Sequence, residues 1–339
     1  MTEKRITTRV TSFDVAELAG VNQSTVSRAL NGDPSITDGT RTRIEEAARK
    51  LGYRVDSRAA RLRTGLTATI AVVVIARAGL SVTEINPFHY SLLGNVCAAA
   101  AARGYQSLVS FQAERADLYS DFIESRQADA VVLLGTSTND TAWEFHRHML
   151  GRSDVACWGS PFADHRRIAS DNRAGGLLAT ERLIKGGYRN IVFVGDLDDR
   201  QAQFRERFEG YQDALEKQGL GAGRAMNSPA DTRFEQGRKS AQALIAGDEA
   251  FDALFCCCDA TALGAIEELV RSGVSVPQQV GVVGFDGLGS GVHSNPPLTT
   301  IEPDFSLAGK MLVAAALGEA DAGAPHRVPV RLVERSSAL

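Results

Sequence analysis

The first fifty residues of the chain place hydrophobic positions at the spacing of α-helices. Val15, Leu18 and Ala19 recur three and four residues apart, which predicts a short helix with these side chains on its buried side. Thr11 and Asp14 form a T-x-x-D pair, a common helix start signal, so we expect this helix to begin near Thr11.

A tight turn and a second helix follow directly. Ala19-Gly20-Val21 is interpreted as the turn, because glycine adopts positive φ angles without steric cost, and Asn22 suits the N-cap of the next helix. In that helix Val26, Ala29 and Leu30 form the predicted buried stripe. The polar side is made by Gln23, Ser24, Ser27, Arg28 and Asn31.

A third helix is predicted by Ile44, Ala47, Ala48 and Leu51, which again have helical spacing. Two short helices joined by a tight turn, with the second polar along one side, are an arrangement that inserts a helix into the major groove of DNA. The alternative is a small helical bundle whose polar side faces only water.

Beyond residue 66 the pattern changes to continuous hydrophobic runs separated by helix-length amphipathic stretches. Such runs suit strands buried on both faces, and their alternation with helices predicts parallel sheets with crossover helices. The runs are Thr69–Ile75, Ala128–Leu134, Asn190–Val194, Ala253–Cys258 and Val280–Phe285. If the strand extends through Cys258, then Cys256 and Cys258 lie on one face of the sheet and Cys257 on the other.

Charge is distributed unevenly along the chain. The 339 residues suffice for two or three domains and carry a net charge of −4. Residues 1–65 contain 12 Lys and Arg against 8 Asp and Glu, whereas the rest contains 25 against 33. A basic end on an acidic body suits a protein that presents one end to phosphates.

The remaining composition favours a binding protein over an enzyme. The five cysteines, three of them adjacent at 256–258, have no metal-ligand spacing, so we interpret the adjacent three as strand packing rather than metal or redox sensing. The chain contains no G-x-S-x-G elbow, no phosphate-binding loop and no G-x-G-x-x-G after a strand, so we expect neither catalysis nor a cofactor. No signal peptide and no apolar run near 18 residues is found, which predicts a cytoplasmic protein without a membrane partner.

Three N-terminal segments resemble the DNA-binding headpiece of the lac repressor (LacI/GalR) family. They are Phe13-Asp-Val-Ala-Glu-Leu-Ala-Gly-Val, Ser24-Thr-Val-Ser-Arg-Ala-Leu-Asn and Thr40–Tyr53. Seven ordered segments continue the resemblance almost to the C-terminus: Asn86-Pro-Phe-His, Asp171-Asn-Arg-Ala-Gly-Gly, Gly187-Tyr-Arg-Asn-Ile, Arg207-Phe-Glu-Gly-Tyr, Asp259-Ala-Thr-Ala-Leu-Gly-Ala, Val282-Val-Gly-Phe-Asp286 and Pro297-Leu-Thr-Thr-Ile.

The resemblance implies a helix-turn-helix headpiece at 1–54, a hinge at 55–66 and an α/β core at 67–339. The core is expected to consist of two doubly wound parallel-sheet subdomains, like the periplasmic binding proteins. A small-molecule effector would then bind in the cleft, near the carboxyl ends of the strands.

The family resemblance also implies which residues read DNA. Arg28 would donate two hydrogen bonds to a guanine, and the variable positions Gln23 and Ser24 would select the operator. One departure is Phe13, where relatives often carry a tyrosine that contacts a phosphate. The implied set is Asn22, Gln23, Ser24, Thr25, Ser27, Arg28 and Asn31, of which Thr25, Ser27 and Asn31 suit phosphate contacts.

In this family the hinge becomes a short helix on the operator, and a leucine wedges into the minor groove. Leu62 occupies that position, with Ala59 on the same helical face. Relatives commonly have Pro-Asn where this chain has Val55-Asp56, which changes the start of the segment. The alternative is an ordinary basic linker.

The effector-contacting set implied by the resemblance is Phe88, His89, Trp158, Arg207 and Asp259. Phe88 and His89 would face the effector ring, and Arg207 and Asp259 would hold its polar groups. The alternatives are a helix N-cap for Asp259 and a surface salt bridge for Arg207. Cys258, Gly159 and Thr232 replace a frequent Asn, Asp and aromatic residue. The alternatives for the effector are therefore a different sugar, a phosphorylated sugar, a nucleoside-like molecule or no effector at all.

Together these features predict a ligand-controlled transcriptional regulator, in the first instance a repressor. Two headpieces of a homodimer would bind a palindromic operator. No leucine-heptad tail is present, which favours a dimer over a tetramer. The alternatives are an activator or corepressor-dependent regulator, and a ligand receptor that does not bind DNA.

Overall fold

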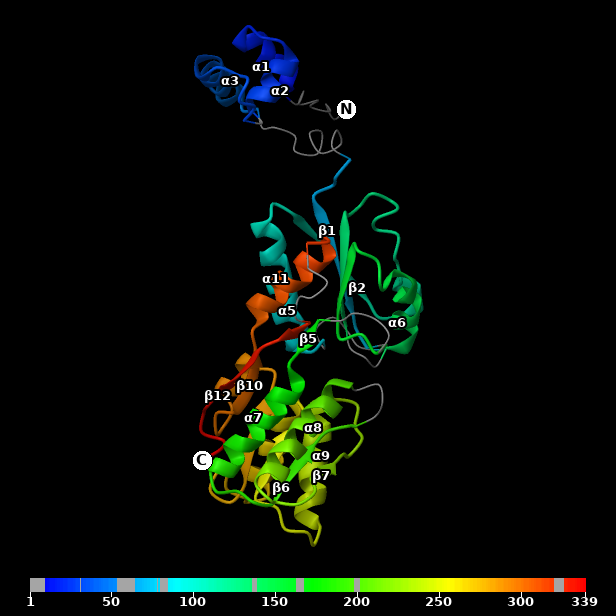
Figure 1. Cartoon of the computed structure of the whole chain (residues 1–339), viewed down its shortest axis with the longest axis vertical. Coiled ribbons are helices and arrows are strands. Elements are labelled where there is room, and N and C mark those ends of the chain that lie inside the picture. The colour runs from blue at the N-terminus through cyan, green and yellow to red at the C-terminus, as the bar shows by residue number, and fades with distance from the viewer. Residues whose placement is uncertain are drawn as a thin grey trace, which may run out of the picture. The chain divides into compact units, whose positions relative to one another are not determined.

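The structure is a computed structural model that describes residues 10–30, 32–53, 65–77, 79, 85–135, 139–162, 168–197, 202–319 and 326–339 (Figure 1). Contacts divide the chain into two units, residues 1–67 and 68–339. The first unit contains three helices: α1 (Ser12–Ala19), α2 (Gln23–Leu30) and α3 (Asp38–Leu51).

The start and end of α1 agree with the sequence signals. The Asp14 carboxylate accepts hydrogen bonds from the amide of Thr11 at 2.7 Å and from its hydroxyl at 2.8 Å. Gly20 ends the helix with a φ of 66°. The prediction that Leu18 lies on the buried side was wrong: Leu18 is 52% exposed, and Ala16 is buried instead. The buried face of α1 is formed by Val15, Ala16 and Ala19, and at 3.6 residues per turn Leu18 lies about 100° around the helix from the centre of that face.

The second unit contains two lobes, each built on its own sheet. Lobe 1 has the all-parallel strand order β2-β1-β3-β4, confirming the strand predicted at Thr69–Ile75. Its strands are β1 (Thr69–Ile75), β2 (Gln106–Gln112), β3 (Ala130–Gly135) and β4 (Val155–Trp158). Helices α5 (Pro87–Ala102) and α11 (Phe305–Ala316) cover one face of this sheet, and α6 (Asp140–His146) covers the other. Lobe 1 also contains the short 3-10 turns η2 (Arg115–Asp117) and η3 (Arg147–Met149).

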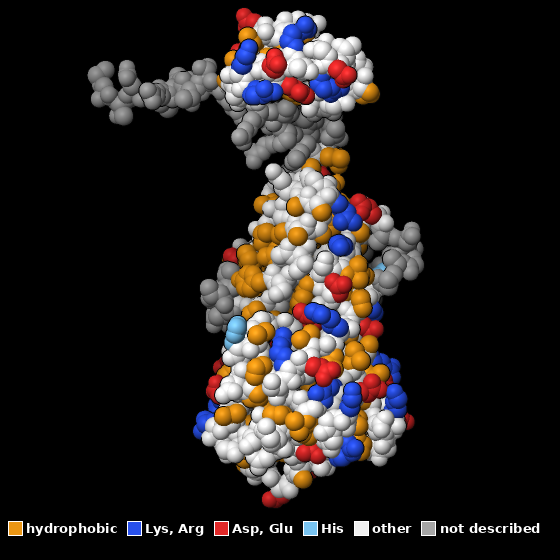
Figure 2. Space-filling model, turned by 90° about the vertical axis from the view of Figure 1, so that its left-hand side faces the viewer, with side chains coloured by type: hydrophobic (Ala, Val, Ile, Leu, Met, Phe, Trp, Pro, Cys, Tyr) orange, Lys and Arg blue, Asp and Glu red, His pale blue; other side chains and the backbone are white. Residues whose placement is uncertain are grey.

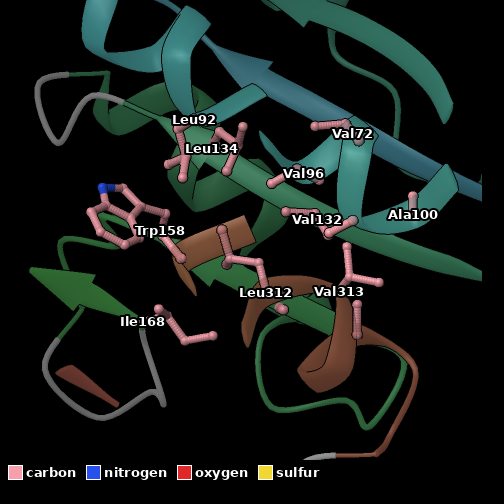
Figure 3. Close-up of a cluster of buried hydrophobic side chains, with 14 of the residues drawn as sticks. Val72, Leu92, Val96, Ala100, Val132, Leu134, Trp158, Ile168, Leu312 and Val313 are labelled. Atoms are coloured by element: carbon pink, nitrogen blue, oxygen red, sulfur yellow. The ribbon is translucent and has the colours of Figure 1, made fainter. Parts of the chain in front are cut away.

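Successive side chains of β1 pack on opposite faces of the lobe 1 sheet, as expected for a strand covered by helices on both faces. Ile70 and Val72 pack under α5 and α11, whereas Ala71 and Val73 pack on the other face with Trp143 of α6. Figure 3 shows the first of these clusters, with Trp158 at one end and Ala100 toward the other.

Lobe 2 has the strand order β12-β10-β9-β8-β6-β7. Its strands are β6 (Ile191–Val194), β7 (Arg224–Met226), β8 (Ala253–Cys256), β9 (Gly281–Phe285), β10 (Thr299–Pro303) and β12 (Val330–Val333). Helices α7 (Asn172–Lys185) and α8 (Ala202–Lys217) cover one face, and α9 (Arg233–Ala246) and α10 (Asp259–Arg271) cover the other. The 3-10 turn η4 (Gly289–Val292) follows β9. Both lobes are therefore doubly wound, as expected, except that β12 pairs antiparallel with β10.

The prediction for the adjacent cysteines was wrong in detail. All three are buried, but Cys257 and Cys258 belong to the cluster under α7 and α8, and Cys256 belongs to the opposite one. Strand β8 ends at Cys256 and Cys258 is already the N-cap of α10, so the two-residue alternation stops before Cys258.

Three segments join the lobes. The chain leaves lobe 1 through β5 (Ala169–Ser170), returns from β10 through Asp304 into α11, and passes back through β11 (Arg327–Val328) into β12. Strands β5 and β11 pair in parallel. Within the described ranges, no helix combines the length and the apolar character that crossing a membrane requires.

Candidate nucleic-acid interface and effector site

Helix α2 is held in place by α3. Its buried residues Val26 and Ala29 enter the core of the first unit. Arg41 of α3 donates from Nη1 to the carbonyl of Ala29 and from Nη2 to the carbonyl of Asp33, each at 2.9 Å. These bonds satisfy carbonyls at and beyond the end of α2, so the helix has a fixed orientation on the unit.

The polar side of α2 is open in the way that a DNA-reading helix requires. Asn22, Ser24 and Arg28 are exposed, and Gln23, Thr25 and Ser27 are half-buried. The Gln23 amide donates to the Ser12 hydroxyl at 3.1 Å, which holds that side chain against α1. Asn31 of the predicted set, and Ala59 and Leu62 of the predicted hinge, lie outside the described residues.

In lobe 2, Arg207 of α8 lies among the ends of three strands. It is 4% exposed, which excludes the surface salt bridge considered above. Its Nε donates to Asn172 Oδ1 at 3.0 Å, and its Nη1 donates to the carbonyl of Cys257 and lies 3.5 Å from Asp286 Oδ1. Its guanidinium stacks 3.5 Å from the centre of the Phe285 ring, so the cation is partnered on its edge and its face.

Asp286 supplies the carboxylate opposite Arg207. It follows β9 directly and has a φ of 121°, a region that non-glycine residues rarely adopt. Burial raises the pKa of Asp286 well above its usual range, although the neighbouring Arg207 lowers it. An unusual backbone that aims a buried carboxylate at a buried guanidinium is typical of a functional site.

Asp259 has a different environment from the one expected. It is fully buried at the first residue of α10, and Cys258, not Asp259, is the N-cap. Its Oδ2 accepts from the Leu288 amide at 2.7 Å and its Oδ1 accepts from the Thr300 hydroxyl at 2.5 Å. Burial raises the pKa of Asp259 to about 6, against the lowering effect of these bonds. The carboxylate therefore connects the start of α10 to the segments after β9 and within β10.

In lobe 1, the predicted effector residues lie at the carboxyl ends of the sheet. Phe88, at the start of α5, is 7% exposed and packs against Trp158 of β4 and Phe305 of α11, with ring centres 5.8 Å and 5.2 Å away. His89 is half-buried, and the carbonyl of Gly135 accepts a hydrogen bond from its ring. Burial lowers the pKa of His89 to about 4, so the ring is neutral at pH 7.

The two lobes meet at Leu288, two residues beyond Asp286. Its side chain belongs to the lobe 1 cluster that contains Phe88 and Trp158, while its amide donates to Asp259. The structure thus brings the lobe 1 and lobe 2 groups to facing strand ends, where doubly wound proteins bind ligands. Sequence reasoning missed Asn172 and Asp286, although both lie in the segments Asp171-Asn-Arg and Val282–Asp286 that were singled out above.

The polar groups of Arg207 are bonded to protein groups in the structure. Two open hollows of about 470 and 480 Å³ lie elsewhere, one at Glu302–Phe305 with Pro329–Arg331 and one between Gln212 and Gly223. Neither is lined by a predicted effector residue. A ligand at Arg207 would therefore exchange its own polar groups for bonds that the protein now makes internally.

A DNA-reading helix unit joined to a two-lobed α/β binding fold defines the class of a ligand-responsive regulator. A family model described as bacterial regulatory proteins, lacI family, matches residues 13–56, and one described as periplasmic binding protein-like domain matches residues 180–338.

Similar proteins have the same organisation. The HTH-type transcriptional regulator CelR of Thermobifida fusca is 32% identical over 335 residues, covering 94% of each chain. The ribose operon repressor of Escherichia coli (strain K12) is 30% identical over 309 residues, covering 89% of this chain and 91% of the relative. The chain belongs to the lacI family of bacterial regulatory proteins, and it is a DNA-binding transcriptional regulator.

Solved structures match the fold over nearly the whole chain. The transcriptional regulator CelR–cellobiose complex has a TM-score of 0.67 and 27% identity, covering 97% of this chain and all of the other. The lac repressor dimer bound to operator and the anti-inducer ONPF has a TM-score of 0.72 at 24% identity, covering 98% and 99%. The predicted class of fold is thereby confirmed.

Proposed function

We propose that the protein is a repressor that binds a palindromic operator as a homodimer and releases it in response to a small polyhydroxylated ligand. The observation that carries the ligand part is the buried set of Arg207, Asp286 and Asn172 at the strand ends of lobe 2. The exposed Arg28 on a rigidly held α2 carries the DNA part. Such a protein acts where the chromosome is, in the cytoplasm.

On the operator, Arg28 would donate two hydrogen bonds to a guanine, and Gln23 and Ser24 would select neighbouring bases. Thr25 and Ser27 suit phosphate oxygens, which set the register without reading sequence. The proposal extends to Asn22 and Asn31 at the two ends of α2. In the hinge it extends to Ala59 and Leu62, which would enter the minor groove.

In the effector site, a guanidinium and a carboxylate held together form a donor and acceptor pair for adjacent hydroxyl groups. Phe88 and Trp158 would provide the apolar wall that sugar sites use against a ring face. The named ligand of a related structure is cellobiose, and a relative is named for ribose, which supports a sugar over a nucleoside. The carboxylate of Asp259 bonds to Leu288 and Thr300, whereas that of Asp286 faces Arg207, so we propose Asp286 in place of Asp259. The groups bind and orient a ligand, and we propose no catalytic step.

The ligand would act by its different affinity for two arrangements of the lobes, only one of which permits tight operator binding. A coupling in the usual range, about 5- to 150-fold in affinity, suffices for regulation.

The test uses the full chain and fluorescence anisotropy on a randomised palindromic DNA library. We expect one palindrome to be selected, and we expect cellobiose, ribose or a related sugar to weaken binding to it. Tighter operator binding in the presence of the sugar would show that the sugar is a corepressor and not an inducer. Failure to select any duplex at moderate salt would contradict the DNA part, and a nucleoside acting in place of all sugars would contradict the ligand class.

A further inference from the structure

The segments that join the two lobes are bonded to one another. The amide of Asp171, after β5, donates to the carbonyl of Val328 in β11 at 2.8 Å. The amide of Asp304, after β10, donates to the carbonyl of Pro329 at 3.1 Å. The third segment therefore contacts the first and the second, and a change in the angle between the lobes must move β11.

One side chain of β11 reaches from these segments into lobe 2. Arg327 Nη2 donates to Glu206 Oε1 at 2.7 Å and its Nη1 donates to Glu206 Oε2 at 2.8 Å. The pair is a two-pronged ion pair, the geometry that most restricts both partners. Its Nη1 also lies 3.4 Å from the carbonyl of Ser170 in β5.

Glu206 in turn contacts the effector site through Asn172. The Asn172 amide donates to Glu206 Oε2 at 2.8 Å, and its carbonyl oxygen accepts from Arg207 Nε at 3.0 Å. Asn172 is 2% exposed, and only one orientation of its amide satisfies both neighbours, because the flipped amide would place a donor against a donor. The bonds thus form one continuous series from Arg327 through Glu206 and Asn172 to Arg207.

We infer that Glu206 and Arg327 are positioning residues that transmit the state of Arg207 to the segments joining the lobes. This inference rests on the proposed function, in which a ligand acts at Arg207. Neither residue need touch the ligand. When a ligand draws the guanidinium of Arg207 away from Asn172, the carbonyl oxygen of Asn172 loses the hydrogen bond that Arg207 donates to it. The side chain of Asn172 is then free to move, and Glu206 and Arg327, which are bonded to it in series, move as well.

The alternative is that the Glu206–Arg327 pair only stabilises the fold. Such a pair would contribute to local stability, but its removal would not alter how the joining segments respond to a change at Arg207. A double-mutant cycle read by hydrogen exchange separates these two roles, because exchange reports the opening of each segment.

The experiment compares Arg207→Lys in two backgrounds of the full chain, unmodified and Glu206→Gln. Lysine keeps the charge at 207 but loses the Nε donor to Asn172. We expect Arg207→Lys to speed exchange in peptides 168–171 and 326–330 on the order of fivefold in the unmodified background. In the Glu206→Gln background the same substitution should have less than about half that effect on the exchange rate. Equal effects in both backgrounds would overturn the inference.

Two controls make the result specific. Glu302→Gln removes another Arg–Glu ion pair, with Arg331, between β10 and β12, and the response to Arg207→Lys should stay complete in that background. Peptide 281–285 in β9 reports whether lobe 2 remains folded. If Arg207→Lys unfolds the lobe, Asn172→Ser replaces it, and its effect on peptides 168–171 and 326–330 must likewise depend on Glu206.

Operator binding separates this inference from the proposed function. With a responsive operator and sugar, Glu206→Gln should reduce the sugar-induced change in operator affinity at least about fivefold while changing sugar affinity less than about threefold. An unaltered sugar response in Glu206→Gln would overturn the inference. If no sugar affects the unmodified chain, the proposed function fails, and the exchange cycle still decides whether Arg207 and the joining segments are coupled.

Discussion

Arg28 and Arg41 lie in the same small unit and carry the same charge, yet their environments assign them different roles. Arg28 is exposed on α2, whereas both terminal nitrogens of Arg41 are bonded to backbone carbonyls. Counting basic residues in this unit therefore overstates how many are available to DNA. The contacts of each guanidinium decide this.

We expect Arg28→Lys to reduce discrimination at one base pair of each half-site by about 1–3 kcal/mol, because an ammonium cannot reproduce the two-pronged contact to guanine. Anisotropy on the selected operator and on single-base variants measures this. Arg43→Ala, at an exposed position of α3, is the matched control and should change affinity for all duplexes alike. Uniform weakening by Arg28→Lys across all base variants would contradict a base-reading role.

His146 is another residue whose surroundings decide its chemistry. It is fully buried in lobe 1, where its Nε2 lies 2.9 Å from Gln112 Oε1, and its Nδ1 has no partner among the described residues. Burial lowers the pKa of His146 to about 4. The unfolded chain therefore binds a proton at this residue at a higher pH than the folded chain does.

The contribution of His146 to stability is complete above about pH 6.5 and is lost as the pH falls toward 4. We expect His146→Gln to lose less stability between pH 7 and pH 5 than the unmodified chain, by on the order of 1–2 kcal/mol. Denaturant unfolding at both pH values measures the difference. Asp259 has the opposite effect on stability, because its raised pKa favours the folded state as the pH falls. Its contribution cancels in the comparison, since the unmodified chain and the His146→Gln variant both contain it. The exposed His293→Gln is the control, and the same change there would contradict the assignment to His146.

At the scale of elements, close helix pairs hold the site residues. A Cβ at Gly176 of α7 would lie 2.0 Å from the carbonyl oxygen of Arg207, and one at Gly210 of α8 would lie 2.0 Å from that of Arg173. Helices α9 and α10 meet in the same way at Gly237 and Gly264. In each pair of helices, two glycines allow the two backbones to approach closely. The position of Arg207 on α8 therefore depends on the close contact between α7 and α8.

We expect Gly176→Ala to lower the free energy of unfolding by about 2–3 kcal/mol, because a backbone carbonyl must move to make room. The same displacement should weaken any ligand response that depends on Arg207. Gly94→Ala is the matched control, since a Cβ at this exposed position of α5 meets nothing within 4 Å. That control should be neutral or gain about 0.5–1 kcal/mol from helix propensity. Equal effects of the two substitutions would contradict the close-packing argument.

Elements were predictable where local pattern alone sets them. The run Thr69–Ile75 is β1 residue for residue, and Thr11 and Gly20 mark the ends of α1. Edge strands such as β2 were missed, because its burial is partial and its sequence Gln106–Gln112 lacks a continuous hydrophobic run. The exposed Leu18 shows that spacing predicts a face but not how far a neighbouring helix covers it.

At the scale of the whole molecule, regulation requires that two headpieces bind one DNA. We expect the full chain to bind a complete palindrome with two chains per duplex and to bind a single half-site on the order of a hundredfold or more weaker, because the second contact becomes intramolecular. Sedimentation velocity gives the stoichiometry and anisotropy gives the affinities. One chain per palindrome, with equal affinity for the half-site, would contradict the homodimer.

The amino-acid sequence by itself determined the DNA-reading helix, the buried strands, the family and the candidate Arg207. These depend on hydrophobic periodicity, capping residues and motifs, which are properties of neighbouring positions. Only the tertiary structure decided that Arg207 faces Asn172 and Asp286, that Asp259 is bonded internally, and that Arg327 reaches Glu206. These partners are 29 to 121 residues apart and meet because the chain passes between the lobes three times. Contacts between such distant positions leave no periodic signal in a single sequence.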